Sequence, residues 1–175
     1  MYDNLVLKNI VENSDILRTK CSDVKNIDDN IIAILDNMLD LMYKSGGIGL
    51  AANQVGITLK LVVIDLQQND KKSPIFLINP EIIEHSNNIV KYKEGCLSVP
   101  GVEHNVDIER YEKVKVKYLD KNSKENIIEA DGLLAVCLQH EIDHLHGKVY
   151  LDHMSKLKRD LAINKVKKFL KMQNK

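Results

Sequence analysis

Two histidines and a glutamate in the segment His140-Glu141-Ile142-Asp143-His144 are the residues of this chain best suited to chemistry. Side chains four positions apart lie on the same face of an α-helix, so both imidazoles can bind one metal ion. Glu141 lies at the edge of that face, where it can act on a water molecule instead of binding the metal. This H-E-x-x-H pattern indicates a metal-dependent hydrolase.

The sequence around this segment predicts a helix over 131–146. Asp131 and Gly132 are a plausible start, an apolar run over 133–138 follows, and Gly147 is a typical end. The same spacing of His, Glu and His also occurs on solvated helix faces that bind no metal. The interpretation as a metal site therefore depends on further ligands elsewhere in the chain.

Cys96 is a candidate third ligand, in the segment Glu94-Gly95-Cys96-Leu97-Ser98. A thiolate from a neighbouring segment would complete a set of two histidines and one cysteine. That set leaves a fourth position open for water, which a catalytic site requires. Gly95 allows the backbone to turn sharply or approach a ligand closely. The alternative for a lone cysteine is a small buried apolar side chain.

A third segment, Gly47-Ile48-Gly49-Leu50-Ala51-Ala52-Asn53-Gln54, combines little side-chain bulk with an amide donor. Its two glycines and two consecutive alanines let another chain come close, and Gln54 can then donate a hydrogen bond. The alternative is a tight loop that leads into a strand near Leu59.

The rest of the sequence predicts the elements that position these segments. Apolar residues at helical spacing predict a helix over 26–44, and an amphipathic helix begins at about Ser155. Strands are predicted at 59–66, at 75–83 with an interruption at Asn79-Pro80, at 88–94 and at 113–117. This order favours an α+β fold, with mostly antiparallel sheets packed around the central metal-binding helix and with an N-terminal and a C-terminal helix.

Composition places the chain in a broad class. Its 175 residues predict one catalytic domain over 1–175, and equal numbers of basic and acidic residues (25 each) favour no particular partner. We expect no specific DNA binding. We find neither a signal pattern nor an apolar run of membrane-spanning length. The three cysteines are an odd number, which favours a reducing compartment. We expect a cytoplasmic protein without a membrane partner.

The three segments, with Gln139 and Leu145-His146-Gly147 extending the histidine segment, resemble the three signature motifs of the peptide deformylase family in order and approximate spacing. The resemblance extends from about residue 5 to the C-terminal helix. It implies a hydrolase that removes the N-formyl group from the initiator methionine of nascent polypeptides and releases formate (EC 3.5.1.88). It also implies one divalent metal ion, natively Fe(II), with Zn, Ni or Co able to substitute.

The resemblance also implies roles for particular residues. Cys96, His140 and His144 match the metal ligands, and Glu141 matches the general base. Gln54 and the backbone N–H of Leu97 match donors to the developing oxyanion. The backbone of Gly49 matches a position that aligns the substrate. The remaining substrate-binding candidates are Ile48, Gly95, Leu133, Val136 and Cys137. Asp143 and Arg110 fall where relatives place an ion pair behind the site.

The chain departs from its relatives in two places. Some relatives carry an arginine in the segment 101–108 that touches the second substrate residue, whereas this chain has Glu103 and His104. Many relatives have proline near the N-terminus where this chain has Ser14. The first departure affects preferences beyond methionine, and the second should matter little for chemistry.

Two other functions compete with this interpretation. A metalloendopeptidase also uses H-E-x-x-H, but its third ligand is usually His or Glu instead of an upstream cysteine. A non-catalytic peptide-binding module with a structural metal would need four protein ligands, and the sequence offers no good fourth.

The C-terminal segment 156–175 has a net charge of +7, from eight basic residues and one acidic residue. One interpretation is a solvated basic face above an apolar stripe. The other is electrostatic contact with RNA of the ribosome, where the nascent substrate emerges.

Overall fold

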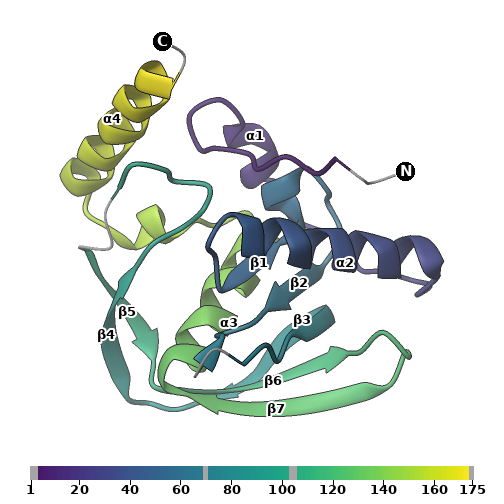
Figure 1. Cartoon of the computed structure of the whole chain (residues 1–175). Helices are drawn as coiled ribbons and strands as arrows, with labels where there is room; N and C mark the ends of the chain where they lie inside the picture. The colour runs from purple at the N-terminus through teal and green to yellow at the C-terminus, as the bar shows by residue number, and fades with distance from the viewer. Residues whose placement is uncertain (1–3, 69–70, 103–105, 174–175) are drawn as a thin grey trace.

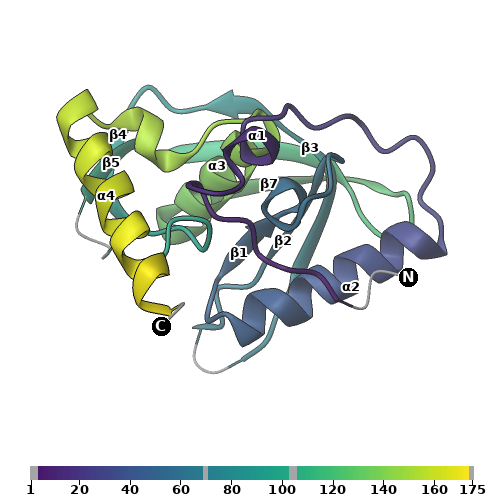
Figure 2. The same cartoon turned by 90° about the horizontal axis from the view of Figure 1, so that it is seen from above.

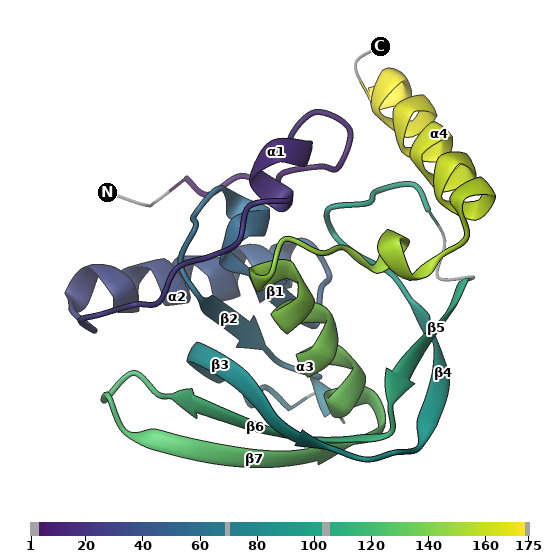
Figure 3. The same ribbon diagram turned by 180° about the vertical axis from the view of Figure 1, so that it is seen from behind.

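Helix α3 (Gly132–Leu145) runs through the centre of the computed structural model, which describes residues 4–68, 71–102 and 106–173 (Figure 1). A five-stranded sheet and a separate two-stranded sheet lie around this helix, as the view from behind shows (Figure 3). Ten of its residues are buried, so α3 is enclosed on most sides. This central position was predicted from the sequence and is confirmed.

All the named strands pair in antiparallel fashion. The larger sheet has the order β1-β2-β3-β6-β7, and the smaller one pairs β4 with β5. The strands span Gly49–Ala51 (β1), Leu61–Ile64 (β2), Ile75–His85 (β3), Ile89–Glu94 (β4), Val106–Tyr111 (β5), Lys113–Leu119 (β6) and Glu125–Asp131 (β7). The α+β class with antiparallel sheets is therefore confirmed.

Strand β3 passes through Asn79-Pro80, where the sequence predicted an interruption. The pairing with β6 shifts register between Ile78 and Glu81, and Asn79 takes a left-handed φ of 52°. The Asn79 side chain exchanges two hydrogen bonds with the backbone of Val24. An irregularity in the sheet thus accommodates the proline without ending the strand.

Helices α1, α2, α3 and α4 and the 3₁₀ turns η1 and η3 accompany these strands. Helix α2 spans Asp29–Lys44, three residues shorter than predicted, because the Asp28 side chain caps it by accepting the N–H of Ile31. The sequence did not predict the short α1 (Ser14–Leu17). The 3₁₀ turns span Ala52–Val55 (η1) and Tyr150–His153 (η3).

The apolar core has three parts, and each involves a different helix. Helix α3 packs on the five-stranded sheet, and α2 packs against β1 and β2. Helix α4 (Lys156–Gln173) buries only Ala162 and Val166 and projects from one corner (Figure 2). None of the helices in the described ranges is long and apolar enough to cross a membrane.

Candidate metal centre and active site

Helix α3 and the turn after β4 bring the three predicted metal ligands together. The Cys96 Sγ and one ring nitrogen each of His140 and His144 all lie within 4.8 Å of one another. The Cys96 Sγ is 3.2 Å from the His144 Nε2, and the two histidine rings are 5.0 Å apart between centroids. This donor set fits a divalent ion, because three converging N and S ligands leave a coordination position open.

The groups around the two histidines also fit a cation. Burial holds the pKa of His144 well below its ordinary value, so its ring is neutral and can act as a ligand. Burial opposes the charged form of His140 too, but hydrogen bonds to Cys96 and Glu94 outweigh it and raise the pKa of His140. The negative groups that attract a proton to this ring also attract a metal ion.

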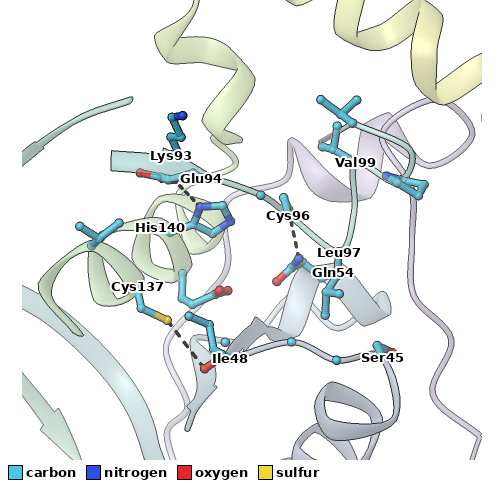
Figure 4. A pocket seen from close by; sticks show the side chains of 18 of the residues that line it. Ser45, Ile48, Gln54, Lys93, Glu94, Cys96, Leu97, Val99, Cys137 and His140 are labelled. Atoms are coloured by element: carbon cyan, nitrogen blue, oxygen red, sulfur yellow. Dashed lines mark hydrogen bonds and ion pairs between the residues drawn. The ribbon is translucent and has the colours of Figure 1, made fainter. Parts of the chain in front are cut away.

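A buried chain of charges orients His140 from behind. The Glu94 carboxylate accepts a hydrogen bond from the His140 Nδ1 at 2.7 Å, so the ring directs its Nε2 toward the ligand cluster (Figure 4). Arg110 donates to both Glu94 oxygens, at 2.6 and 3.0 Å, and to Asp143 at 2.6 Å. The predicted pair of Arg110 and Asp143 is thus present, and Glu94 joins it to a metal ligand.

This network keeps its acids ionised. Burial opposes ionisation of Asp143, but His153 and Arg110 outweigh it and lower the pKa of Asp143 to about 2. Hydrogen bonds from His140 and Arg110 likewise overcome burial and lower the pKa of Glu94. A fixed negative charge behind His140 makes that imidazole a better donor to a metal.

Glu141 is 4% exposed and faces the backbone of β1. A methyl group built on Gly49 would lie 2.5 Å from the Glu141 Oε1, so the glycine leaves room for this carboxylate. Burial raises the pKa of Glu141 to about 7. A carboxyl group with such a pKa can both accept and return a proton near neutral pH.

Gln54 lies in η1 with its amide directed at the ligand cluster. Its Oε1 accepts the N–H of Ala51 at 2.8 Å, which fixes the orientation of the amide. Its Nε2 donates to the Ser98 Oγ at 3.2 Å and lies 3.5 Å from the Cys96 Sγ (Figure 4). An N–H donor is therefore held beside the ligands.

A cavity of about 470 Å³ adjoins the ligand cluster. Cys96, His140, Glu141, Gln54 and Leu97 line it, together with all six predicted substrate-binding residues: Ile48, Gly49, Gly95, Leu133, Val136 and Cys137. Val136 and Cys137 are buried, whereas Leu133 is 41% exposed at the surface. Glu103 and His104 lie outside the described residues.

The sequence interpretation did not give Glu94 and Ser98 a role. Glu94 orients His140, and the fully buried Ser98 accepts a hydrogen bond from Gln54. An acid two positions before a ligand cysteine was a usable signal, because ligating histidines usually bond to a carboxylate or carbonyl. The Ser98 contact depends on tertiary structure and has no comparable signal in the sequence.

The fold and this arrangement of ligands, buried acid and cavity define a metal-dependent hydrolase. The polypeptide deformylase family model matches residues 7–160. The peptide deformylase of Bartonella quintana is 48% identical over 160 residues, covering 91% of this chain and 90% of that protein. Peptide deformylase 1 of Pseudomonas syringae is 46% identical over 172 residues, covering 98% of each.

Solved structures agree with these relatives. The crystal structure of a peptide deformylase from Legionella pneumophila has a TM-score of 0.90 and 41% identity, covering 98% of each chain. One from Synechococcus elongatus, in complex with actinonin, has a TM-score of 0.85 and 41% identity, covering 93% of this chain and 88% of that one. The chain belongs to the peptide deformylase family. Its activity is removal of the N-formyl group from nascent peptides (EC 3.5.1.88).

Proposed function

We propose that the substrate is the N-formylated initiator methionine at the start of a nascent chain. The observation that carries this proposal is the cavity beside Glu141 and the ligand cluster, lined by Ile48, Leu133 and Val136. An apolar slot of this kind accepts the flexible thioether of methionine. The peptide that follows would pair its backbone with β1, the edge strand of the larger sheet, so binding would tolerate many sequences.

Cys96, His140 and His144 would hold one divalent ion. When bound, this ion supplies Lewis acidity that makes hydroxide available from water near neutral pH. The chain's own residues do the rest. Glu141 takes a proton from the water as the water oxygen bonds to the formyl carbon. It then gives that proton to the departing amine as the carbon–nitrogen bond breaks, leaving formate and a free methionine terminus.

Gln54 and Leu97 would stabilise the negative oxygen that forms on the formyl carbon. The Gln54 Nε2 already lies within 3.5 Å of the Cys96 Sγ, and Leu97 follows Cys96 in the same turn. Each such donor contributes roughly 3 kcal/mol in comparable oxyanion sites. Because Ala51 and Ser98 hold the Gln54 amide in place, little reorganisation is needed during the reaction.

Fe(II) is the native metal in this proposal, with Zn, Ni or Co as substitutes. A soft thiolate ligand suits Fe(II) as well as Zn, and an iron site with a cysteine ligand is vulnerable to oxidation. Activity of the iron form should decay in air while that of the nickel form persists. Equal air stability of the two forms would argue against iron.

The enzyme would act in the cytoplasm. Its basic helix α4 would bind the ribosome at the place where the nascent substrate emerges. Of its eighteen residues, two are buried, so most of its lysines are free to meet an anionic surface. Binding to ribosomes should weaken steeply as salt concentration rises. Salt-insensitive binding, or none, would remove this part of the proposal.

The substrate assignment is tested by comparing formyl-Met and formyl-Ala tripeptides with unformylated casein. We expect fast formate release from the methionine peptide, slower release from the alanine peptide and no cleavage of casein. Cleavage of casein would instead favour the metalloendopeptidase.

A further inference from the structure

One wall of the cavity is made of backbone with little side-chain support. Residues 45–49 form this wall, from the end of α2 to the first residue of β1, and include three glycines. The N–H groups of Gly46 and Gly47 bond to the carbonyls of Tyr43 and Met42, which ties the wall to α2 at one end. A segment so poor in side chains depends on the hydrogen bonds of its backbone for its position.

The position of Gly47 sets how the wall meets the turn that carries Cys96. A methyl group built on Gly47 would lie 2.8 Å from the Leu97 Cδ1, so the two segments are already in close contact. Movement of the Gly47 backbone would therefore change the space between the wall and Leu97, which both line the cavity.

A side chain behind the wall holds this carbonyl. The Gln67 Nε2 donates to the carbonyl oxygen of Gly47 at 3.1 Å, from outside the set of residues that line the cavity. Gln67 has a left-handed φ of 50°, which is uncommon for a residue with a side chain. This backbone conformation directs its amide back toward the wall.

Asp65 maintains that conformation. Its Oδ1 accepts the N–H of Gln67 at 2.9 Å, and its Oδ2 accepts the N–H of Ser73 at 3.0 Å and the hydroxyl of Tyr43. Its own N–H donates to the carbonyl of Ile48 at 2.9 Å. Asp65 is 2% exposed, so a buried carboxylate joins Gln67, α2 and the wall into one unit.

We propose that Gln67 is a positioning residue for substrate binding, acting through the carbonyl of Gly47 and held in place by Asp65. The inference rests on the proposed function of the cavity. Among the described residues, Gln67 forms no hydrogen bond with Glu141, Gln54 or the metal ligands. Its loss should therefore raise KM for the peptide and leave the chemical step unchanged.

The test is steady-state kinetics on metal-loaded Gln67→Leu, with Gln68→Leu as the matched control. Gln68 is the neighbouring glutamine and its side chain is exposed. We expect Gln67→Leu to raise KM for a formyl-Met tripeptide roughly fivefold, the effect of losing one neutral hydrogen bond, with kcat within about twofold. Gln67→Arg, which keeps N–H donors, should recover part of the loss. Thermal unfolding of each variant checks that it is folded.

A KM for Gln67→Leu equal to that of Gln68→Leu would overturn the role, as would a loss confined to kcat. Absence of turnover in the wild-type enzyme and in the Gln68→Leu control would instead overturn the proposed function on which the role depends.

Discussion

Glu141 is the residue on which the proposed chemistry depends most. Its carboxylate is buried against Gly49 and its pKa is raised to about 7, mainly by burial. A bound divalent ion nearby would favour the ionised form, which is the form that accepts a proton. The same group can then protonate the departing amine.

Replacing Glu141 with Gln should lower kcat by roughly 10²–10⁴-fold, because the amide keeps the shape but cannot accept the proton. KM should change little, since the cavity wall is retained. Metal content must be measured in parallel, because Glu141 lies next to the ligand His140. Wild-type turnover by a metal-loaded variant would show that another group is the base.

Replacing Val136 tests whether the cavity holds the methionine side chain. Val136 is 4% exposed and lines the cavity, so it belongs both to the core and to the pocket. Val136→Ala should lower kcat/KM for formyl-Met peptides by roughly tenfold, as expected for lost apolar contacts to a substrate side chain. Formyl-Ala peptides, which do not reach the pocket, should be affected much less. An equal loss for both substrates would refute the pocket.

At the scale of elements, the end of α3 is fixed by contacts with the N-terminal part of the chain. The Asn53 Nδ2 donates to the carbonyls of Leu17 and His144, which joins η1, α1 and α3. Gly147 follows α3 with a φ of 72°, and a methyl group built on it would lie 2.2 Å from the carbonyl oxygen of Arg18. The helix that carries both histidines is thus held at its C-terminal end by backbone contact.

Gly147→Ala should therefore destabilise the protein by roughly 3 kcal/mol or more, through backbone strain and a steric clash. Gly132→Ala is the matched control, because Gly132 also has a positive φ, of 54°, but has nothing within 4 Å of the added methyl. It should cost only roughly 1–2 kcal/mol. Urea unfolding measures the change in the free energy of unfolding for both variants. Equal losses of stability would mean that the backbone at Arg18 moves aside and accommodates the added methyl group.

The elements that sequence predicted best are those whose pattern is local. The histidine helix, α2 and α4 follow from apolar spacing and capping residues, and the predicted strands at 59–66, 75–83, 88–94 and 113–117 overlap β2, β3, β4 and β6. The sequence interpretation missed β1, β5 and β7. Strand β1 has only three residues in a glycine-rich segment, and β7 buries only Ala130 of its seven residues. Pairing with neighbouring strands determines these elements, which a local pattern does not show.

Part of the candidate site was also predictable, because its motifs are local in the sequence. The spacing within the motifs predicts Cys96, His140, Glu141 and His144 as site residues, because the ligands and the acid occur in short recognisable segments. The contact of Gln67 with Gly47 joins residues twenty positions apart. Only the folded chain places that amide behind the cavity wall.

At the scale of the whole molecule, the candidate site lies where distant segments meet. The wall at 45–49, η1, the turn after β4 and α3 all contribute to one cavity, with the two sheets around α3 holding them together (Figures 1 and 4). Each sheet supplies a different part. The larger sheet carries β1 and leads into α3, while the smaller sheet positions Glu94 and Arg110 behind His140.

The most direct test is formate release from a formyl-Met tripeptide by protein reconstituted anaerobically with Fe(II) or with nickel. We predict fast release that requires the metal and is absent with the unformylated peptide and with metal-stripped protein. Absence of release from folded, metal-loaded protein would contradict the account, because the Cys96, His140 and His144 cluster would then support no deformylation.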